Sequence, residues 1–128
     1  MTDLVTFIEA RLAEDEDLAR RAALGQPDWH YVSWIDGVSG PDGSLVVNDR
    51  HVDVGVDADD AIKPSEAPHI ARHDPARVLR EVQAKRKAIE THRWHGPDGC
   101  EEDRFCPLLT AMAAVYADNT DYQAEWAP

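Results

Sequence analysis

The pair Asp74-Pro75 fixes where the longest helix of this chain begins. Aspartate accepts hydrogen bonds from the free N–H groups of a first helical turn, and proline has a φ angle suited to the first helical position. Four residues beyond the pair recur at helical spacing, which places them on one stripe: Val78, Val82, Ile89 and His92. The sequence therefore predicts a helix over residues 75–93, with His92 at the end of its apolar stripe.

A second amphipathic helix is predicted over residues 1–24. Thr2 or Asp3 can cap its start, and Gly25-Gln26-Pro27 stops it. Its apolar residues recur at intervals of three and four, the period of one helical face: Leu4, Val5, Ile8, Leu12 and Ala19.

The rest of the chain predicts an α+β fold. Residues 28–56 hold three short runs rich in β-branched and aromatic residues (29–35, 45–47 and 51–54), which predict an antiparallel hairpin or three-stranded meander. We expect an acidic loop over 57–74, in which residues 57–68 form at most one helical turn. Cys106-Pro107 opens a C-terminal helix over 107–117, and Tyr122 and Trp126 indicate that the tail 118–128 packs against the fold.

Composition favours one soluble domain spanning residues 1–128. The 128 residues are 43% hydrophobic and 30% charged, with a net charge of −12, within the range of globular proteins. No apolar run approaches the roughly 18 residues that span a bilayer, and no signal peptide is evident. We therefore expect a cytoplasmic protein without a membrane segment. So acidic a chain should be repelled by nucleic acid, which we do not expect as a partner.

Charge is distributed unevenly. The run Glu14-Asp15-Glu16-Asp17 is either a solvated face or a docking surface for a basic partner. Between Arg72 and Arg93 there are seven basic and three acidic residues, a local charge of +4 that leaves −16 for the rest. We expect this basic helix to pair with the acidic first helix, within one chain or across a homodimer. A nucleic-acid recognition helix is the alternative, which the surrounding negative charge opposes.

Both cysteines and two of the six histidines lie within fifteen residues of one another. His92 and His95 end the predicted helix, a Gly96-Pro97-Asp98-Gly99 turn follows, and then come Cys100 and Cys106. Imidazole and thiolate are the usual ligands of tetrahedral zinc, and a helix N-terminus stabilises a thiolate. The sequence therefore predicts a structural zinc site formed by His92, His95, Cys100 and Cys106.

Two alternatives to zinc stay open. The spacing H-x2-H-x4-C-x5-C matches no common zinc finger, so the cysteines can instead be reduced thiols, one of them buried as a small hydrophobe. A reactive or disulfide-forming pair is disfavoured in a reducing compartment. His69 and His73 form a second pair, four residues apart. They can act as ligands on one helical face, but we favour a short turn in which His69 caps or packs.

From His69 onward the sequence resembles a known family. The segment His69-Ile70-Ala71-Arg72-His73-Asp74-Pro75 continues to Val82, and the ending combines Cys106-Pro107 with Tyr116-Ala117-Asp118, Asp121-Tyr122 and Glu125-Trp126. Both are similar to a family of small uncharacterised proteins of actinobacteria and their phages, catalogued as a domain of unknown function. The resemblance covers most of the chain and is weakest over residues 36–66. It implies a small accessory role of phage or prophage origin and supplies no catalytic residue.

Taken together, the sequence predicts a non-enzymatic accessory or regulatory protein that binds a protein partner and is stabilised by structural zinc. One alternative is an acidic decoy that mimics nucleic acid and inhibits a DNA-binding or defence protein. The other is a small metal- or thiol-dependent enzyme, for which the chain offers no G-x-S-x-G element and no glycine-rich phosphate loop.

Overall fold

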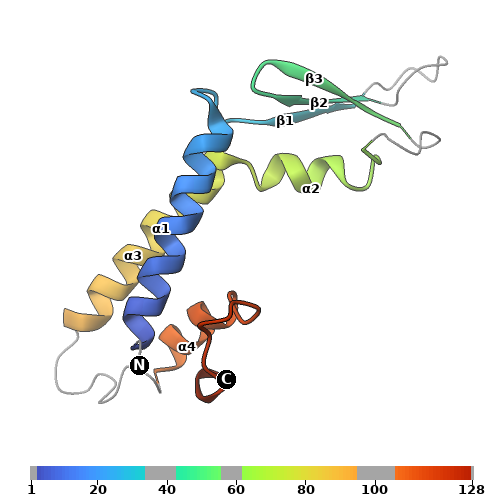
Figure 1. Cartoon of the computed structure of the whole chain (residues 1–128). Helices are drawn as coiled ribbons and strands as arrows, with labels where there is room; N and C mark the ends of the chain where they lie inside the picture. Colours follow the sequence, from blue (N-terminus) through green and yellow to red (C-terminus); the bar gives the residue numbers. More distant parts are fainter. Residues whose placement is uncertain (1–2, 34–42, 56–61, 95–105, 128) are drawn as a thin grey trace. The chain divides into compact units, whose positions relative to one another are not determined.

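The computed structural model describes residues 3–33, 43–55, 62–94 and 106–127 (Figure 1). Its helices are α1 (Leu4–Ala23), α2 (Ala67–Arg72), α3 (Pro75–Trp94), α4 (Pro107–Ala114) and the 3-10 helix η2 (Ala124–Trp126). Its strands are β1 (His30–Ser33), β2 (Gly43–Val47) and β3 (Arg50–Val54). These elements confirm the predicted α+β fold class.

The chain forms two compact units. One, which we call the helical unit, comprises Met1–Glu16 and Glu81–Pro128; the other, the sheet unit, comprises Asp17–Arg80. Helices α1 and α3 are each divided between the two units, α1 after Glu16 and α3 after Arg80. The prediction of a single domain over residues 1–128 stays a prediction.

Helix α1 begins after Asp3, one of the two residues that the sequence predicts as its cap. The Asp3 Oδ1 atom accepts a hydrogen bond from the Thr6 N–H at 2.9 Å, the geometry of an N-cap. The predicted apolar stripe is buried from Leu4 to Ala19, and Phe7, which that prediction omitted, is buried with it. The helix ends where Leu24 and Gly25 take φ angles of 44° and 84°, a left-handed ending that glycine favours.

In the sheet unit, Asp74 begins α3 as predicted. Its Oδ1 atom accepts the Arg77 N–H at 2.9 Å, and its Oδ2 atom accepts the Trp29 N–H at 3.0 Å. A third bond joins the Ala76 N–H to the Pro27 carbonyl at 3.0 Å. One carboxylate thus caps α3 and also holds the segment that leads into β1.

The three strands form the predicted antiparallel meander in the order β1-β2-β3. Val47 pairs with Arg50 around a two-residue turn in which Asn48 and Asp49 have φ angles of 49° and 64°, the signs of a type I′ hairpin. The Asn48 side chain also donates to the Ala22 carbonyl at 2.8 Å and accepts from the Trp29 indole at 3.4 Å. This turn therefore fixes the hairpin to the end of α1.

The prediction of a loop over 57–74 is wrong for its second half, where α2 lies. Proline at the start of α2 suits a first helical turn, and the Glu66 side chain accepts the Lys63 N–H just before it. Ala67 is buried with the sheet residues Leu45, Val47 and Val54, while Ile70 and Ala71 pack against this cluster. Packing on the sheet thus stabilises a helix of six residues that the polar, proline-containing sequence concealed.

The C-terminal tail belongs to the core of the helical unit, as Tyr122 and Trp126 predicted. The Trp126 side chain is 1% exposed, and its ring centroid lies 5.0 Å from that of Phe7. Helix α4 ends at Ala114 rather than at residue 117, because the next N–H groups, those of Tyr116 and Ala117, bond three residues back. The tail then turns and re-forms a short helix at η2.

Candidate functional site

The structure brings together two of the four residues predicted to bind zinc. Cys106 precedes Pro107 at the start of α4, and its Sγ atom lies 3.6 Å from Nδ1 of His92 in the last part of α3. The thiol is free and buried, with 2% of the residue exposed, whereas His92 is half-buried. His95 and Cys100 lie outside the described residues.

The separation of these two atoms suits two different arrangements. Zn–S and Zn–N bonds of about 2.3 and 2.0–2.1 Å at a tetrahedral angle place the sulfur and nitrogen about 3.6 Å apart. A thiol–imidazole hydrogen bond has a similar length. Among the described residues, no three His, Cys, Asp or Glu side chains form a group that could hold a metal. The zinc prediction therefore depends on His95 and Cys100.

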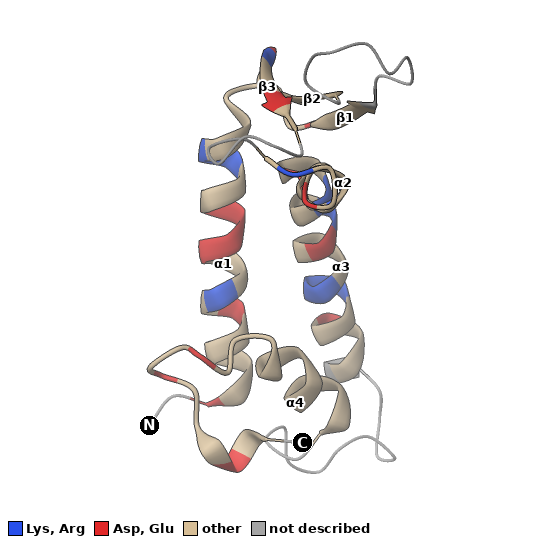
Figure 2. Cartoon of the chain, turned by 90° about the vertical axis from the view of Figure 1, so that its right-hand side faces the viewer, with Lys and Arg blue, Asp and Glu red and all other residues tan. Residues whose placement is uncertain are grey.

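The acidic run of α1 is engaged by other side chains of the same chain. Each of its four carboxylates has its own partner: Arg11 for Glu14, the Tyr116 hydroxyl for Asp15, Arg86 for Glu16 and Arg21 for Asp17. The contact between Arg86 and Glu16, at 2.6 Å, confirms that the basic helix pairs with the acidic one within one chain. Figure 2 shows acidic and basic positions together on α1 and α3.

The contact between Tyr116 and Asp15 joins residues far apart in the sequence. The Tyr116 hydroxyl donates to the Asp15 Oδ2 atom at 2.6 Å. Burial raises the pKa of Tyr116 above the ordinary value of 10.0, and the hydrogen bond and negative charge of Asp15 raise it further, as does the charge of Glu81. Arg11 acts in the opposite direction. The phenol is therefore held in its neutral, hydrogen-bonding form.

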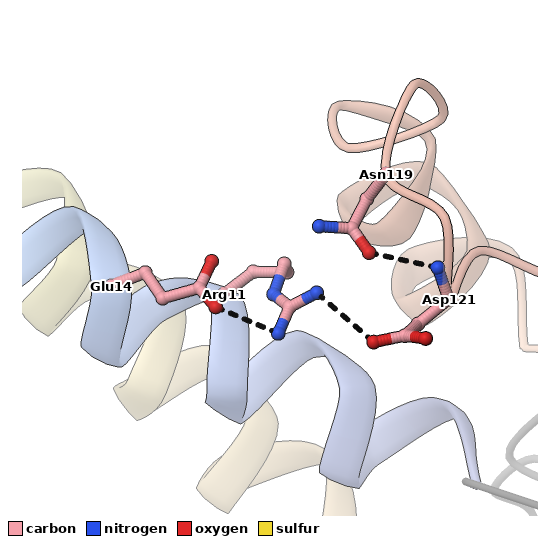
Figure 3. Close-up of polar contacts among 4 residues, drawn as sticks. All are labelled: Arg11, Glu14, Asn119 and Asp121. Atoms are coloured by element: carbon pink, nitrogen blue, oxygen red, sulfur yellow. Dashed lines mark hydrogen bonds and ion pairs between the residues drawn. The ribbon is translucent and has the colours of Figure 1, made fainter.

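Arg11 links α1 to the turn that follows α4 (Figure 3). Its guanidinium contacts Glu14 at 2.8 Å and Asp121 at 3.8 Å, and it lies 5.2 Å from the centre of the Phe7 ring. The backbone N–H of Asp121 in turn donates to the Asn119 side chain at 2.9 Å. The Arg11 side chain is 12% exposed, so it fixes the tail rather than presenting a charge to a ligand.

Helix α4 has two faces, and both are apolar. Cys106, Leu109 and Ala113 are buried, together with Thr110, whose hydroxyl donates to the Cys106 carbonyl. The opposite side exposes three residues that share one stripe, which we call the apolar stripe: Leu108, Ala111 and Val115. Leu108 is 44% and Val115 65% exposed. A helix that packs by one face alone carries polar residues on the other.

The segment that contains the apolar stripe is also purely acidic. Residues 106–127 contain three acids (Asp118, Asp121 and Glu125) and no lysine, arginine or histidine. Figure 2 shows α4 free of charged residues and acidic positions in the described chain beyond it. An apolar stripe followed by carboxylates differs from the mixed charges of α1 and α3.

Comparison with known proteins identifies the family. The whole chain, residues 1–128, matches the family described as "Family of unknown function (DUF6221)". The chain belongs to this family. The sequence resemblance to a family of unknown function is thereby confirmed, and membership assigns no activity to any residue.

No curated protein and no solved structure matches the chain. Within the described residues, none of the helices combines the length and apolar character that crossing a bilayer requires.

Sequence reasoning did not find the apolar stripe. The sequence shows only that Leu108, Leu109, Met112 and Val115 are all apolar, and a helix that is apolar all round is ordinarily buried. The structure differs from this expectation, because Leu109 is buried whereas Leu108 is exposed. The spacing Leu108-x2-Ala111-x3-Val115 places these residues on one helical side, and this spacing could have indicated the apolar stripe from the sequence.

Proposed function

We propose that the chain is a non-enzymatic accessory protein that binds a protein partner through the apolar stripe of α4. The exposure of Leu108 and Val115 on one side of a packed helix carries this proposal. The occupant that fits is another protein with an apolar patch bordered by basic side chains, because residues 106–127 supply carboxylates and no cation. Nucleic acid fits poorly, since it would meet carboxylates of its own charge.

Such an interface would be small and would depend on few residues. Burying an exposed leucine or valine contributes on the order of 1 kcal/mol when the side chain is already half covered. Replacing both Leu108 and Val115 with glutamine, a polar residue that helices accept well, should therefore weaken binding roughly 30-fold.

The test compares captured proteins across matched variants. Wild-type chain, Leu108→Gln/Val115→Gln and the control Leu18→Gln/Leu24→Gln are each used as bait. Leu18, on α1, is 58% exposed, and Leu24, directly after α1, is 76% exposed. The proposal expects a protein that wild type and control retain, that the α4 variant loses, and that binds wild type when both are purified. Equal retention by all three baits, or loss with the control alone, would refute it.

A second copy of the chain is the simplest competing occupant. Sedimentation of the same three proteins at high concentration addresses this directly. Self-association that Leu108→Gln/Val115→Gln abolishes would assign the stripe to a homodimer instead of a distinct partner.

We also propose that His92 and Cys106, with His95 and Cys100, hold a structural zinc ion. The approach of Cys106 Sγ to His92 Nδ1 supports this proposal, as does the position of the thiol at a helix start, where the dipole favours thiolate. Four such ligands would close the coordination sphere, which suits a structural and not a catalytic site.

Elemental analysis of purified protein tests the zinc proposal. We expect one zinc per chain, lost in Cys100→Ser as well as Cys106→Ser. The Cys100 variant matters because replacing the buried Cys106 can disturb the core by itself. Metal-free protein that is fully folded would end the proposal and leave the thiol–imidazole hydrogen bond.

The two alternative functions gain no specific support. A nucleic-acid decoy needs carboxylates in a row at phosphate-like spacing, whereas each carboxylate of the acidic run has a partner within the chain. A thiol enzyme needs an accessible nucleophile, and Cys106 is 2% exposed. A cytoplasmic location and a phage or prophage origin stay part of the proposal.

A further inference from the structure

We propose that His69 and His73 form a surface site for a late first-row divalent metal such as Ni²⁺, Cu²⁺ or Zn²⁺. The pair lies at the end of α2 in the sheet unit, and it shares no residue with the proposed zinc site. His69 lies in the last turn of α2, and His73 is the residue at which the helix ends. Paired histidines four residues apart are a recurrent metal-binding arrangement where both rings lie on one side.

The spacing of the two rings suits a shared metal ion. Their centroids lie 4.4 Å apart, with an angle of 36° between the ring planes. Two imidazoles bound side by side to one ion, with metal–nitrogen bonds of 2.0–2.1 Å, have centroids about 4.5–5 Å apart. The separation of the two rings is therefore close to that of two imidazoles on one ion.

The hydrogen bond of His73 prepares its other nitrogen for a metal. The Nδ1 atom lies 2.9 Å from the His69 carbonyl oxygen, and since a carbonyl only accepts, Nδ1 carries the proton. In the neutral ring the lone pair is then on Nε2. Metal-binding histidines are commonly held by such a bond to a backbone carbonyl, which fixes both tautomer and orientation.

Both side chains are accessible to solvent, as a metal site on the surface requires; a residue that packs in the core would be buried. His69 and His73 are exposed, whereas Ala67 of the same helix is completely buried. The expected packing role of His69 is therefore wrong, and the capping role belongs to His73, whose ring bonds the helix-end carbonyl. Two imidazoles leave coordination positions for water, and imidazole ligands favour Ni²⁺, Cu²⁺ and Zn²⁺ over Mg²⁺ or Ca²⁺.

The test measures Ni²⁺ binding to the full, untagged chain by calorimetry. His69→Ala and His73→Ala are compared with the double variant His30→Ala/His51→Ala, which removes two exposed histidines on β1 and β3. We expect one Ni²⁺ per chain, at least tenfold weaker binding in both His69→Ala and His73→Ala, and wild-type binding in the control. Circular dichroism confirms that each variant is folded.

Cys106→Ser separates this site from the proposed zinc site. It should retain Ni²⁺ binding, and wild-type protein should show no thiolate–nickel charge-transfer band at one equivalent of metal. Binding that follows Cys106, or that the control variant weakens as much as His73→Ala, would overturn the proposal. Nitrogen-15 spectra should show the His69 and His73 ring signals broadened first by Ni²⁺; broadening of other histidines first would also overturn it.

Discussion

Replacing Asp74 with alanine should destabilise the sheet unit more than the loss of an ordinary helix cap. Asp74 is 8% exposed, and its two carboxylate oxygens accept different backbone N–H groups. One comes from Arg77 in the first turn of α3 and the other from Trp29, 45 residues earlier in the chain. Alanine removes both acceptors at once.

The magnitude follows from these two bonds. Losing an N-cap costs about 1 kcal/mol. Leaving the part-buried Trp29 N–H without an acceptor costs about 1–3 kcal/mol more. The free energy of unfolding should therefore fall by about 2–4 kcal/mol in Asp74→Ala. In Asp74→Asn the amide oxygen can still cap α3, but the amide nitrogen cannot accept from Trp29, so an intermediate loss is expected.

Urea unfolding followed by circular dichroism compares these variants with Asp3→Ala. Asp3 caps α1 through the Thr6 N–H but is exposed, so its replacement should cost about 1 kcal/mol. The expected order of stability is wild type, then Asp74→Asn, then Asp74→Ala, with Asp3→Ala clearly above Asp74→Ala. If Asp74→Ala cost no more than Asp3→Ala, or Asp74→Asn matched wild type, the second role of Asp74 would be refuted.

Three other changes test the remaining contacts. Trp126→Ala should lower the free energy of unfolding by about 3–5 kcal/mol, measured by urea unfolding, and a loss below 1 kcal/mol would show that the tail is not core. Asp49→Gly should stabilise the β2–β3 hairpin by about 0.5–1 kcal/mol, because glycine tolerates the positive φ angle; a lower thermal midpoint would contradict this. Because folding raises the pKa of Tyr116, its stabilising effect is present below pH 10 and is lost as pH rises further. Tyr116→Phe should therefore lessen the fall in urea midpoint from pH 9 to 11; equal profiles for wild type and Tyr116→Phe would refute the assignment.

The parts of the fold that the sequence predicted are those determined by neighbouring residues. Asp3 and Asp74 each accept a hydrogen bond from an N–H three residues ahead. The cap and the first helical turn can therefore be predicted from one short stretch of sequence. The three strands likewise follow from short β-branched and aromatic runs. His92 and Cys106 were predicted to approach each other because a helix end and a helix start flank one turn-rich segment, and the described atoms agree.

The parts that the sequence did not predict depend on distant partners. Helix α2 is stabilised by the sheet, since Ala67 joins the cluster around Leu45, and nothing between residues 57 and 74 encodes that contact. The β2–β3 turn lacks the glycine that usually marks a type I′ hairpin; Asn48 and Asp49 adopt its positive φ angles instead. The apolar stripe was hidden for the same reason, because burial and not residue type separates the two sides of α4.

In the acidic run, the position of each carboxylate around the helix determines which group it contacts. Four consecutive helical residues point in directions about 100° apart, so Glu14, Asp15, Glu16 and Asp17 cannot form one row of carboxylates. Each direction instead meets a different group: Arg11 and Arg21 of the same helix, Arg86 in the middle of α3, and Tyr116 after α4. A sequence motif that suggests a docking surface for a basic partner thus serves internal contacts, while the apolar stripe that we propose as the binding surface lies on a helix that carries no charge.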